Sequence, residues 1–364
     1  MRKSPNNQDE TKRVAIIGSQ GVPPKYGGFE TLVDNIISNK SPNVEYTIFC
    51  SAPDMDTDLS YYKGCRLKYV PIRAHGIMSV PYDIVSMIHA IRGYDAILVL
   101  GVSGCVFLPA MRLLSGARII VNIDGLEHKR DKWDSMAKRF LKFSLDSCMK
   151  WAHEIVSDNK GIYDFVKDVY KREARLIAYG GDHAIRDVNR KRQSAMLEFH
   201  GLSECEYDLS ICRIEPENNC EMTLEAYAGS GHHLAFVGNW NHSDYSRDLY
   251  DRFKNEPGIH LLKSIYDLDA LYALRNNARR YVHGHRAGGT NPSLVEAMFF
   301  GKPIMAFDVI YNRETTQNKA YYYSDTKSLR ALLDSKELQG SATREVARSQ
   351  YVWELIARQY EELY

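Results

Sequence analysis

The sequence predicts an α/β protein of two domains, each built on an open parallel sheet. The chain has 364 residues, which is too long for one ordinary core. Short apolar runs alternate with helical patterns along both halves, and this alternation is typical of parallel α/β sheets. Residues 180–205 carry few strand signals, so the boundary is expected there. The predicted domains are residues 1–185 and 186–350, followed by a terminal helix at 351–364.

Each half contributes its own set of expected elements. In the first half, apolar runs predict strands at Val14–Ile17, Tyr46–Cys50, Leu67–Pro71, Ala96–Leu100 and Arg118–Ile123, with helices such as Pro81–Ile91 between them. In the second half, strands are expected at Tyr207–Cys212, Leu234–Val237, Gly258–Leu262, Tyr281–His283 and Ile304–Phe307. The intervening helices are expected at Cys220–Ala228, Ser246–Asn255 and Leu268–Arg275.

The composition is that of a soluble globular protein, with 44% hydrophobic and 26% charged residues and a net charge of +1. The seven cysteines form no CxxC pair and no zinc-binding spacing, which fits a reduced cytoplasmic protein. The polar N-terminus lacks the apolar segment of a signal peptide. The longest uncharged run, Ala96–Ala110, is too short to span a bilayer. A cytoplasmic location is therefore predicted, with any membrane contact being peripheral.

The stretch Tyr281–Phe307 carries the strongest functional signal. It begins with the end of an apolar strand, which is followed by a glycine-containing turn. Asn291 is a good N-cap and Pro292 suits the first helical position, so a helix is expected to begin there. Gly301 is expected to end that helix, because glycine readily adopts the left-handed conformation found after a last turn.

A strand, a glycine turn and a helix start together favour an anion site, because unpaired backbone N–H groups and the helix dipole attract negative charge. Gly288 and Gly289 lack a Cβ, so a phosphate can approach the main chain closely. Glu296 lies about one turn into the helix, where a carboxylate suits neutral sugar hydroxyls better than phosphate. A structural turn with a solvated Glu296 is the alternative; the flanking pattern favours the ligand.

The segment GHRAGGTNPSLVEAM, followed by GKPIMAFD, resembles the nucleotide-sugar site of family-4 glycosyltransferases, most closely the bacterial rhamnosyltransferase-like branch. The resemblance implies the GT-B fold, in which two Rossmann-like domains face a central cleft and the C-terminal helix crosses back to the first domain. It assigns Glu296 to the nucleotide ribose, and Gly288, Gly289, Thr290 and Asn291 to the donor. The family's first glutamate is replaced here by Gly288, as in the rhamnosyltransferase-like branch.

Two further segments resemble parts of the family's donor site. In CRIEPENNCEM, Arg213 matches the arginine that holds the diphosphate, and Asn218 stands where the family has a lysine. A surface ion pair is the alternative for Arg213, and Arg286 is a candidate substitute for the missing lysine. In GNWNHSDYSRDL, Asn239 and Trp240 are expected to border the nucleotide base.

The loop GVPPKYGGFE resembles the family's first glycine loop. The resemblance implies that Gly27 and Gly28 face the donor diphosphate, and that Tyr26 and Glu30 lie on the acceptor side. An ordinary turn between a strand and a helix is the alternative, since the GxGxxG dinucleotide pattern is incomplete here.

The segment IIVNIDGLEHKRDKW ends a strand in polar and charged residues, where open α/β sheets keep active-site groups. Asp124 could accept the acceptor hydroxyl's proton or could cap the following helix, and both readings stay open. Glu127, Lys129 and Arg130 are assigned to the acceptor side. A longer segment to Trp151 mixes cations with Phe and Leu, which fits either an anionic bilayer surface or an ordinary solvated helix.

The resemblance implies a retaining glycosyltransferase with Asp124, Glu296 and Arg213 as catalytic residues. It would move a sugar, such as rhamnose or another deoxyhexose, from a nucleoside-diphosphate sugar to a lipid-pyrophosphate-linked saccharide in O-antigen, capsule or exopolysaccharide biosynthesis. It is expected to contact the anionic inner membrane surface peripherally and not to bind nucleic acid. The alternatives are a sugar-nucleotide epimerase of the same fold and a non-catalytic sugar-nucleotide-binding subunit.

No metal and no cofactor are expected. His283 and His285 are spaced like ligands on one strand face, but no carboxylate or cysteine joins them. Metal-dependent glycosyltransferases of the other fold require a pair of acidic residues directly after an apolar strand. The aspartates that lie close together in this sequence do not follow such a strand. These aspartates are Asp54, Asp56, Asp58, Asp267 and Asp269.

Overall fold

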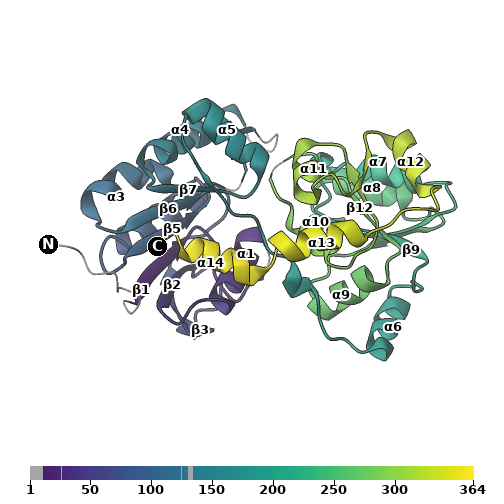
Figure 1. Cartoon of the computed structure of the whole chain (residues 1–364), viewed down its shortest axis with the longest axis horizontal. Helices are drawn as coiled ribbons and strands as arrows, with labels where there is room; N and C mark the ends of the chain where they lie inside the picture. The colour runs from purple at the N-terminus through teal and green to yellow at the C-terminus, as the bar shows by residue number, and fades with distance from the viewer. Residues whose placement is uncertain (1–10, 26, 124, 130–133, 288) are drawn as a thin grey trace. The chain divides into compact units, whose positions relative to one another are not determined.

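The computed structural model describes residues 11–364 except for 26, 124, 130–133 and 288. It divides into two compact units, and each is built on a mainly parallel sheet, as predicted (Figure 1). The first unit ends at Ala178 and also includes Trp353–Tyr364, while the second is Tyr179–Val352. The change of unit after Ala178 precedes the expected boundary at residue 185.

The first unit contains an eight-stranded sheet in the order β3-β4-β2-β1-β5-β6-β7-β8. All its strand pairs are parallel except the antiparallel pair β3 and β4. Every residue of β5 is buried, because an inner strand of a parallel sheet is covered on both faces. The strands are β1 (Lys12–Ile17), β2 (Val44–Ser51), β3 (Tyr61–Tyr62), β4 (Cys65–Val70), β5 (Ala96–Leu100), β6 (Arg118–Asn122), β7 (Glu154–Ser157) and β8 (Arg175–Leu176).

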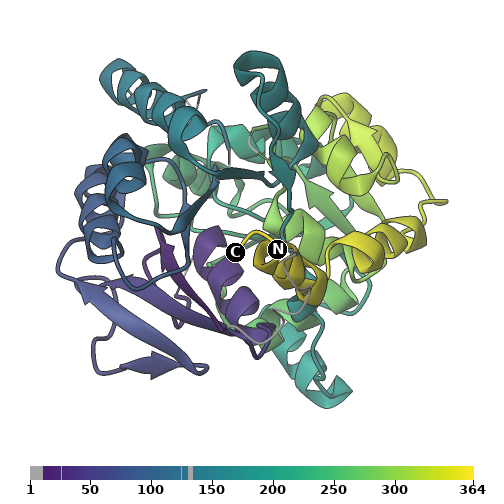
Figure 2. The ribbon, with the colours of Figure 1, turned by 60° about the vertical axis from the view of Figure 1, so that its left-hand side comes forward.

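Helices of the first unit are α1 (Gly28–Ser38), α2 (Ser79–His89), α3 (Leu108–Leu114), α4 (Ser135–Trp151), α5 (Lys160–Tyr170) and α14 (Trp353–Glu361). The last of them, α14, returns from the end of the chain and packs against α1, as predicted (Figures 1 and 2). The Asn122 side chain donates to the Tyr360 hydroxyl over 2.7 Å, and the backbone N–H of Ser41 donates to Glu361 over 2.8 Å. These bonds fix the chain's end to the first sheet.

The second unit contains a six-stranded parallel sheet in the order β11-β10-β9-β12-β13-β14. Its core gathers buried side chains from β10, β12 and β13 and from the helices that cover them, including Phe236, Val282, Met305 and Leu329. The strands are β9 (Tyr207–Ile211), β10 (His233–Val237), β11 (Ile259–Leu262), β12 (Arg280–His283), β13 (Ile304–Phe307) and β14 (Tyr321–Tyr323).

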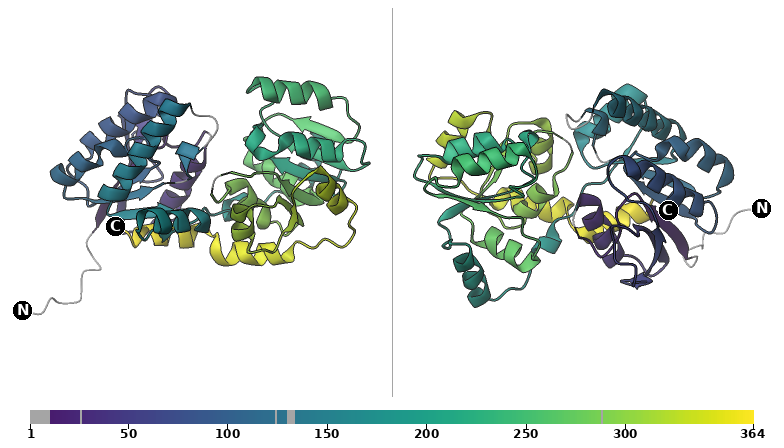
Figure 3. Two further views of the ribbon diagram at one scale, coloured as in Figure 1. Left: turned by 90° about the horizontal axis from the view of Figure 1, so that it is seen from above. Right: turned by 180° about the vertical axis from the view of Figure 1, so that it is seen from behind.

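Helix α6 of the second unit occupies part of residues 180–205, the segment with few strand signals where the domain boundary was expected. It begins after Asn189, whose side chain accepts from the Arg192 N–H over 2.9 Å, and it packs beside α9 (Figures 1 and 3). The helices here are α6 (Arg190–Phe199), α7 (Cys220–Tyr227), α8 (Asp244–Phe253), α9 (Leu268–Asn277), α10 (Pro292–Met298), α11 (Ile310–Thr316), α12 (Thr326–Leu333) and α13 (Ser341–Gln350).

A buried ion pair joins β9 to its neighbour β12. Asp208 on β9 is fully buried and accepts two hydrogen bonds from the Arg280 guanidinium, over 2.9 and 2.7 Å. Two parallel bonds fix both distance and orientation. The pair therefore holds in register the two strands whose following loops form the candidate site.

Candidate functional site

The candidate site lies where the order of the second sheet reverses. The chain leaves β9 towards β10 and β11, and β12 then pairs on the opposite side of β9. In open α/β sheets the loops diverge at such a point, beyond the carboxyl ends of the strands, and ligands bind in the resulting crevice. Residues 212–219 follow β9 and residues 284–291 follow β12, so both segments singled out in the sequence meet here.

Hydrogen bonds tie these two loops together. The Asn219 side chain donates to the Gly284 carbonyl over 2.8 Å, and the Arg286 backbone N–H donates to the Glu217 carbonyl over 3.0 Å. The Asn218 side-chain oxygen and His285 Nδ1 form a further bond. The loops approach so closely that a Cβ on Gly284 would lie 2.2 Å from the backbone oxygen of Asn218.

We therefore expect Gly284→Ala to separate the two loops and to weaken nucleoside-diphosphate binding by about tenfold or more. Once the loops move apart, groups on both of them can no longer contact the diphosphate at the same time. Titration calorimetry of the purified variant measures this effect. Gly116→Ala is the matched control, because a Cβ there meets no atom within 4 Å. Unchanged affinity in Gly284→Ala would show that the contact between the loops plays no part in binding.

Arg213 emerges directly after β9 with its guanidinium largely available. Its side chain is 45% exposed, and its nearest carboxylate oxygens belong to Glu215 and Glu217, at 3.8 and 4.0 Å. Ion pairs this long and exposed contribute little, so a bound anion would compete with them readily. A planar guanidinium at this position suits bidentate contact with phosphate oxygens.

Asn218 connects the two loops through hydrogen bonds of its side chain. Its side chain is buried, and its amide nitrogen donates to the Arg213 carbonyl over 2.7 Å. Its oxygen is bonded to His285, as described above. Asn218 thus positions the main chain of Arg213; its assignment to the donor stays a prediction.

The start of α10 has the predicted capping geometry. The Asn291 side chain accepts from the Ser293 N–H over 3.0 Å, Pro292 occupies the first helical position, and Gly301 has a φ of +65° after the helix. Thr290 is buried and Gly289 is partly exposed, while Gly288 lies outside the described residues. The helix has only seven residues, so we expect its dipole to contribute little to an anion site at this position.

Glu296 is a largely covered, doubly paired carboxylate, and the alternative of a solvated Glu296 is wrong. Its side chain is 15% exposed; one oxygen is bonded to Arg275 and the other lies 3.3 Å from Nε2 of His183. Burial raises the pKa of Glu296, but the charge of Arg275 and the hydrogen bond from His183 outweigh it and lower this pKa overall. A carboxylate kept ionised retains lone pairs that can accept hydroxyl protons.

Arg275 and His183 were not predicted from the sequence. Arg275 lies on α9 with its side chain only 5% exposed, and His183 lies in the short 3₁₀ turn Asp182–Ala184 at the start of the second unit. Both are far from Glu296 in the chain and belong to no short motif. One signal in the sequence could have pointed to Arg275. It is a charged residue on the buried side of α9, where Leu274 and Asn277 are also buried.

His283 at the end of β12 is buried, and its Nε2 has no hydrogen-bond partner. Burial, together with the neighbouring His285, holds the pKa of His283 well below its usual range, so the ring is neutral near pH 7. Among the described residues, no group of three or more His, Cys, Asp or Glu side chains is placed to hold a metal ion.

The loop after β10 separates the two residues expected near the base. Asn239 is exposed, and its side chain accepts from the Asn241 N–H over 3.1 Å. Trp240, in contrast, is 4% exposed, packs edge-on against Phe236 and donates its indole N–H to the Leu262 carbonyl. Trp240 is therefore a core residue, and the expectation that it borders a ligand is wrong.

In the first unit, the glycine loop follows β1 at the corresponding reversal between β1 and β5. Gly27 has a φ of +129°, and a Cβ there would lie 1.9 Å from a Glu30 carboxylate oxygen. Gly28 begins α1. Glu30 is buried and accepts from the Gln20 N–H over 2.7 Å, so its carboxylate closes the loop on itself.

Only some of the residues predicted to lie on the acceptor side are among those that the structure describes. Glu127 is partly exposed and begins the 3₁₀ turn Glu127–Lys129. Asp124, Tyr26 and Arg130 lie outside the described residues, as does the side chain of Lys129. These assignments stay predictions.

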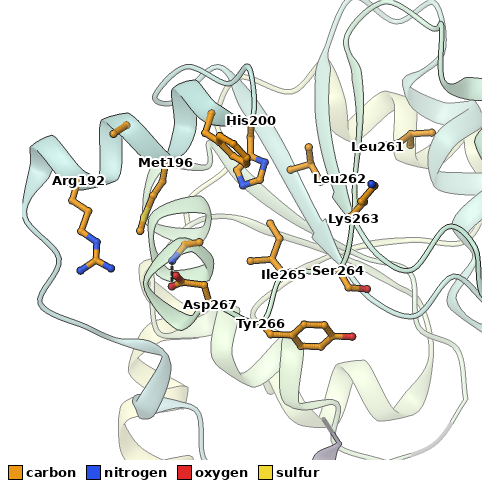
Figure 4. A pocket seen from close by; sticks show the side chains of 13 residues that line it. Arg192, Met196, His200, Leu261, Leu262, Lys263, Ser264, Ile265, Tyr266 and Asp267 are labelled. Carbon is orange, nitrogen blue, oxygen red and sulfur yellow. Dashed lines mark hydrogen bonds between the residues drawn. The ribbon is translucent and has the colours of Figure 1, made fainter. Parts of the chain in front are cut away.

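A separate groove of about 660 Å³ lies between α6 and the segment that leads from β11 into α9 (Figure 4). Its volume falls within the range of small-molecule sites. Its walls include Met196 and Phe199 on one side and Ile265 and Tyr266 on the other. None of the catalytic, donor-binding or acceptor-side residues predicted from the sequence lines it. It borders β11, the edge strand of the sheet, which β10 and β9 separate from β12.

Comparisons with known proteins support the fold. A family model described as a domain of unknown function (DUF1972) matches residues 11–182. No curated protein sequence matches the chain. Among solved structures, sucrose-phosphate synthase from Thermosynechococcus elongatus is 17% identical, with 97% of this chain and 98% of that chain covered and a TM-score of 0.78.

Two other solved structures are similar over nearly their whole length. HepE from Anabaena, in complex with UDP and glucose, is 13% identical, covers 96% of this chain and 98% of its own, and has a TM-score of 0.75. The catalytic domain of starch synthase IV from Arabidopsis thaliana, bound to ADP and acarbose, is 13% identical and has a TM-score of 0.70. The match covers 97% of this chain and 98% of that one. The chain thus has the two-domain GT-B architecture of parallel α/β sheets.

Proposed function

We propose that the chain is a retaining, metal-independent glycosyltransferase that uses a nucleoside-diphosphate sugar. One observation carries the proposal. The loops after β9 and β12 are hydrogen-bonded to each other at the reversal of the second sheet. One loop carries Arg213, whose side chain is 45% exposed, and the other leads into the helix that carries Glu296. Similarity in fold to proteins solved with UDP and with ADP supports the same function.

Each part of the site has a chemical task in this proposal. Arg213 and backbone N–H groups of residues 284–291 bind the diphosphate and stabilise the charge that develops on it as the glycosidic bond breaks. Glu296 accepts hydrogen bonds from ribose hydroxyls, and its pairing with Arg275 and His183 fixes its orientation. The leaving diphosphate assists removal of the acceptor proton, with Asp124 as the candidate protein base.

The finer assignment is to family 4 and its rhamnosyltransferase-like branch. The donor sugar is then rhamnose or another deoxyhexose, and the acceptor is a lipid-pyrophosphate-linked saccharide of O-antigen, capsule or exopolysaccharide assembly. The motif GHRAGGTNPSLVEAM supports this assignment. Such an acceptor requires contact with the inner membrane surface. In the described part of the chain, every helix lacks either the length or the hydropathy needed to cross a bilayer.

A panel of sugar nucleotides tests the function. A donor present at a hundred times its dissociation constant should stabilise the folded protein by about 2.7 kcal/mol, which thermal unfolding detects. The donor so identified is then incubated with lipid-linked saccharides, and the product is analysed for a lengthened glycan. Release of an epimerised free nucleotide without acceptor would indicate the epimerase instead. Binding without any turnover would indicate a non-catalytic subunit.

Metal independence is a separate expectation, because three of the five neighbouring aspartates already serve structural contacts. Asp267 caps α9, Asp269 pairs with Arg186, and Asp54 accepts from Ser51. Transfer should therefore persist at an undiminished rate in excess EDTA. Loss of activity on chelation, restored by Mn²⁺ or Mg²⁺, would contradict this expectation.

A further inference from the structure

Helix α4 of the first unit presents apolar side chains on two opposite sides. One side packs into the unit and consists of Leu141, Ser144, Leu145, Cys148 and Met149. On the other side Met136, Phe140 and Phe143 follow one another at spacings of four and three residues, so they form a single stripe along the helix. They are 79%, 36% and 64% exposed, so Met136 and Phe143 project largely into solvent and Phe140 is covered only in part.

Positive charge accompanies the stripe. Residues 135–151 hold four cations (Lys138, Arg139, Lys142, Lys150) and one acid (Asp146), a difference of 4 − 1 = +3. Arg139 lies three residues after Met136 and four before Phe143, so it borders the stripe directly. Asp146 forms an ion pair with Lys142 at 2.5 Å and accepts a hydrogen bond from the Tyr170 hydroxyl at 2.6 Å. The exposed side of α4 is therefore both apolar and basic.

We propose that this exposed stripe of α4 binds the surface of an anionic phospholipid bilayer. Phe140, Phe143 and Met136 would enter the boundary between headgroups and acyl chains, while Arg139 contacts the anionic headgroups. A stable protein partner usually takes about 800 Å² from each side, far more than one stripe of three side chains offers. An interfacial helix needs only such a stripe with cations beside it.

The position of α4 gives the contact a purpose. The helix begins at Ser135, directly after the segment predicted to lie on the acceptor side, which includes the turn Glu127–Lys129. A bilayer bound along α4 would present a lipid-linked saccharide next to that segment. This purpose rests on the proposed function; the binding of lipid itself does not.

Vesicle binding tests the proposal without reference to catalysis. The purified chain is mixed with phosphatidylglycerol-containing vesicles or with pure phosphatidylcholine vesicles, and the bound fraction is measured by flotation. We expect clear binding to the anionic vesicles that weakens with added salt. The double variant Phe140→Ser/Phe143→Ser should bind them about tenfold more weakly or worse, and Arg139→Gln should lose about fivefold.

Controls separate lipid binding from folding and from the donor site. Phe199→Ser, which replaces an equally large and 85% exposed side chain on α6, should bind vesicles as the wild type does. All variants should keep the wild-type unfolding temperature and nucleoside-diphosphate affinity, because the altered side chains are exposed and distant in sequence from residues 212–219 and 284–291. Nucleotide affinity is measured separately from vesicle binding, so a failure of the proposed function can be distinguished from a failure of the lipid proposal.

Three outcomes would overturn the proposal. The first is that the wild type does not float with anionic vesicles, and the second is that the double variant floats as well as the wild type. The third is that light scattering finds a dimer that the double variant dissociates, because a second copy of the chain would then cover the stripe.

Discussion

Glu296→Ala should lower the free energy of unfolding by about 3–5 kcal/mol and reduce sugar transfer by orders of magnitude. Removing the carboxylate leaves Arg275, with a side chain 5% exposed, as a buried charge without its partner. Denaturant unfolding measures the first effect and initial transfer rates the second. Because the pKa of Glu296 is lowered on folding, its contribution to stability should be complete above its unfolded-state pKa and should fall as the pH drops through the lowered value.

A second variant separates the structural role of Glu296 from its role in binding the donor. In Glu296→Ala/Arg275→Met the unpaired guanidinium is also removed, so much of the lost stability should return. Transfer should stay low, because the ribose hydroxyls still lack their acceptor. If the double variant recovers both stability and near-normal turnover, Glu296 serves the fold alone.

Arg213→Ala should weaken nucleoside-diphosphate binding by about ten- to a hundredfold. A guanidinium meeting a diphosphate makes charge-assisted hydrogen bonds worth about 1.5–3 kcal/mol each. The nearest charged side chains, Glu215 and Glu217, are anionic acceptors and cannot replace these bonds. Arg213→Lys should recover only part of the affinity, since an ammonium cannot form the paired contact. Isothermal titration calorimetry with the diphosphate gives these values.

Two controls accompany the Arg213 variants. The bare nucleoside should bind the wild type and both variants alike, because it offers no phosphate to Arg213. Arg118→Ala removes a comparably exposed arginine at the start of β6 in the first unit, whose partner is Glu154, and should leave affinity unchanged. Wild-type affinity in Arg213→Ala would move the diphosphate contact elsewhere, with Arg286 the next candidate.

The sequence predicts the two sheets well because their signals are local. Ala96–Leu100 and Ile304–Phe307 match β5 and β13 at both ends, since an uninterrupted apolar run is what a strand covered on both faces requires. The limits of α10 follow from the conformational preferences of Asn291, Pro292 and Gly301, which act within one turn. Helix α6 was missed because it buries only Gln193 and Leu197, too few positions to produce a helical pattern.

The chemistry of the site was harder to predict because it depends on contacts between distant segments. Arg275 and His183 reach Glu296 from α9 and from the start of the second unit, and no spacing rule connects the three. Asn218 is uncharged where the family that the sequence resembles has a lysine. Only the structure shows its bonds to Arg213 and His285. Trp240 follows a strand end, as many ligand contacts do, but its indole turns into the core.

We infer that a nucleoside diphosphate binds where the loops after β9 and β12 meet. Hydrogen exchange of the wild-type chain, measured by mass spectrometry with and without the nucleoside diphosphate that stabilises it, locates the bound nucleotide. We expect slower exchange in peptides covering residues 212–219 and 284–291, with little change in peptides covering 192–200 and 261–267 around the separate groove. Protection confined to that groove, with exchange in both loops unaltered, would contradict it.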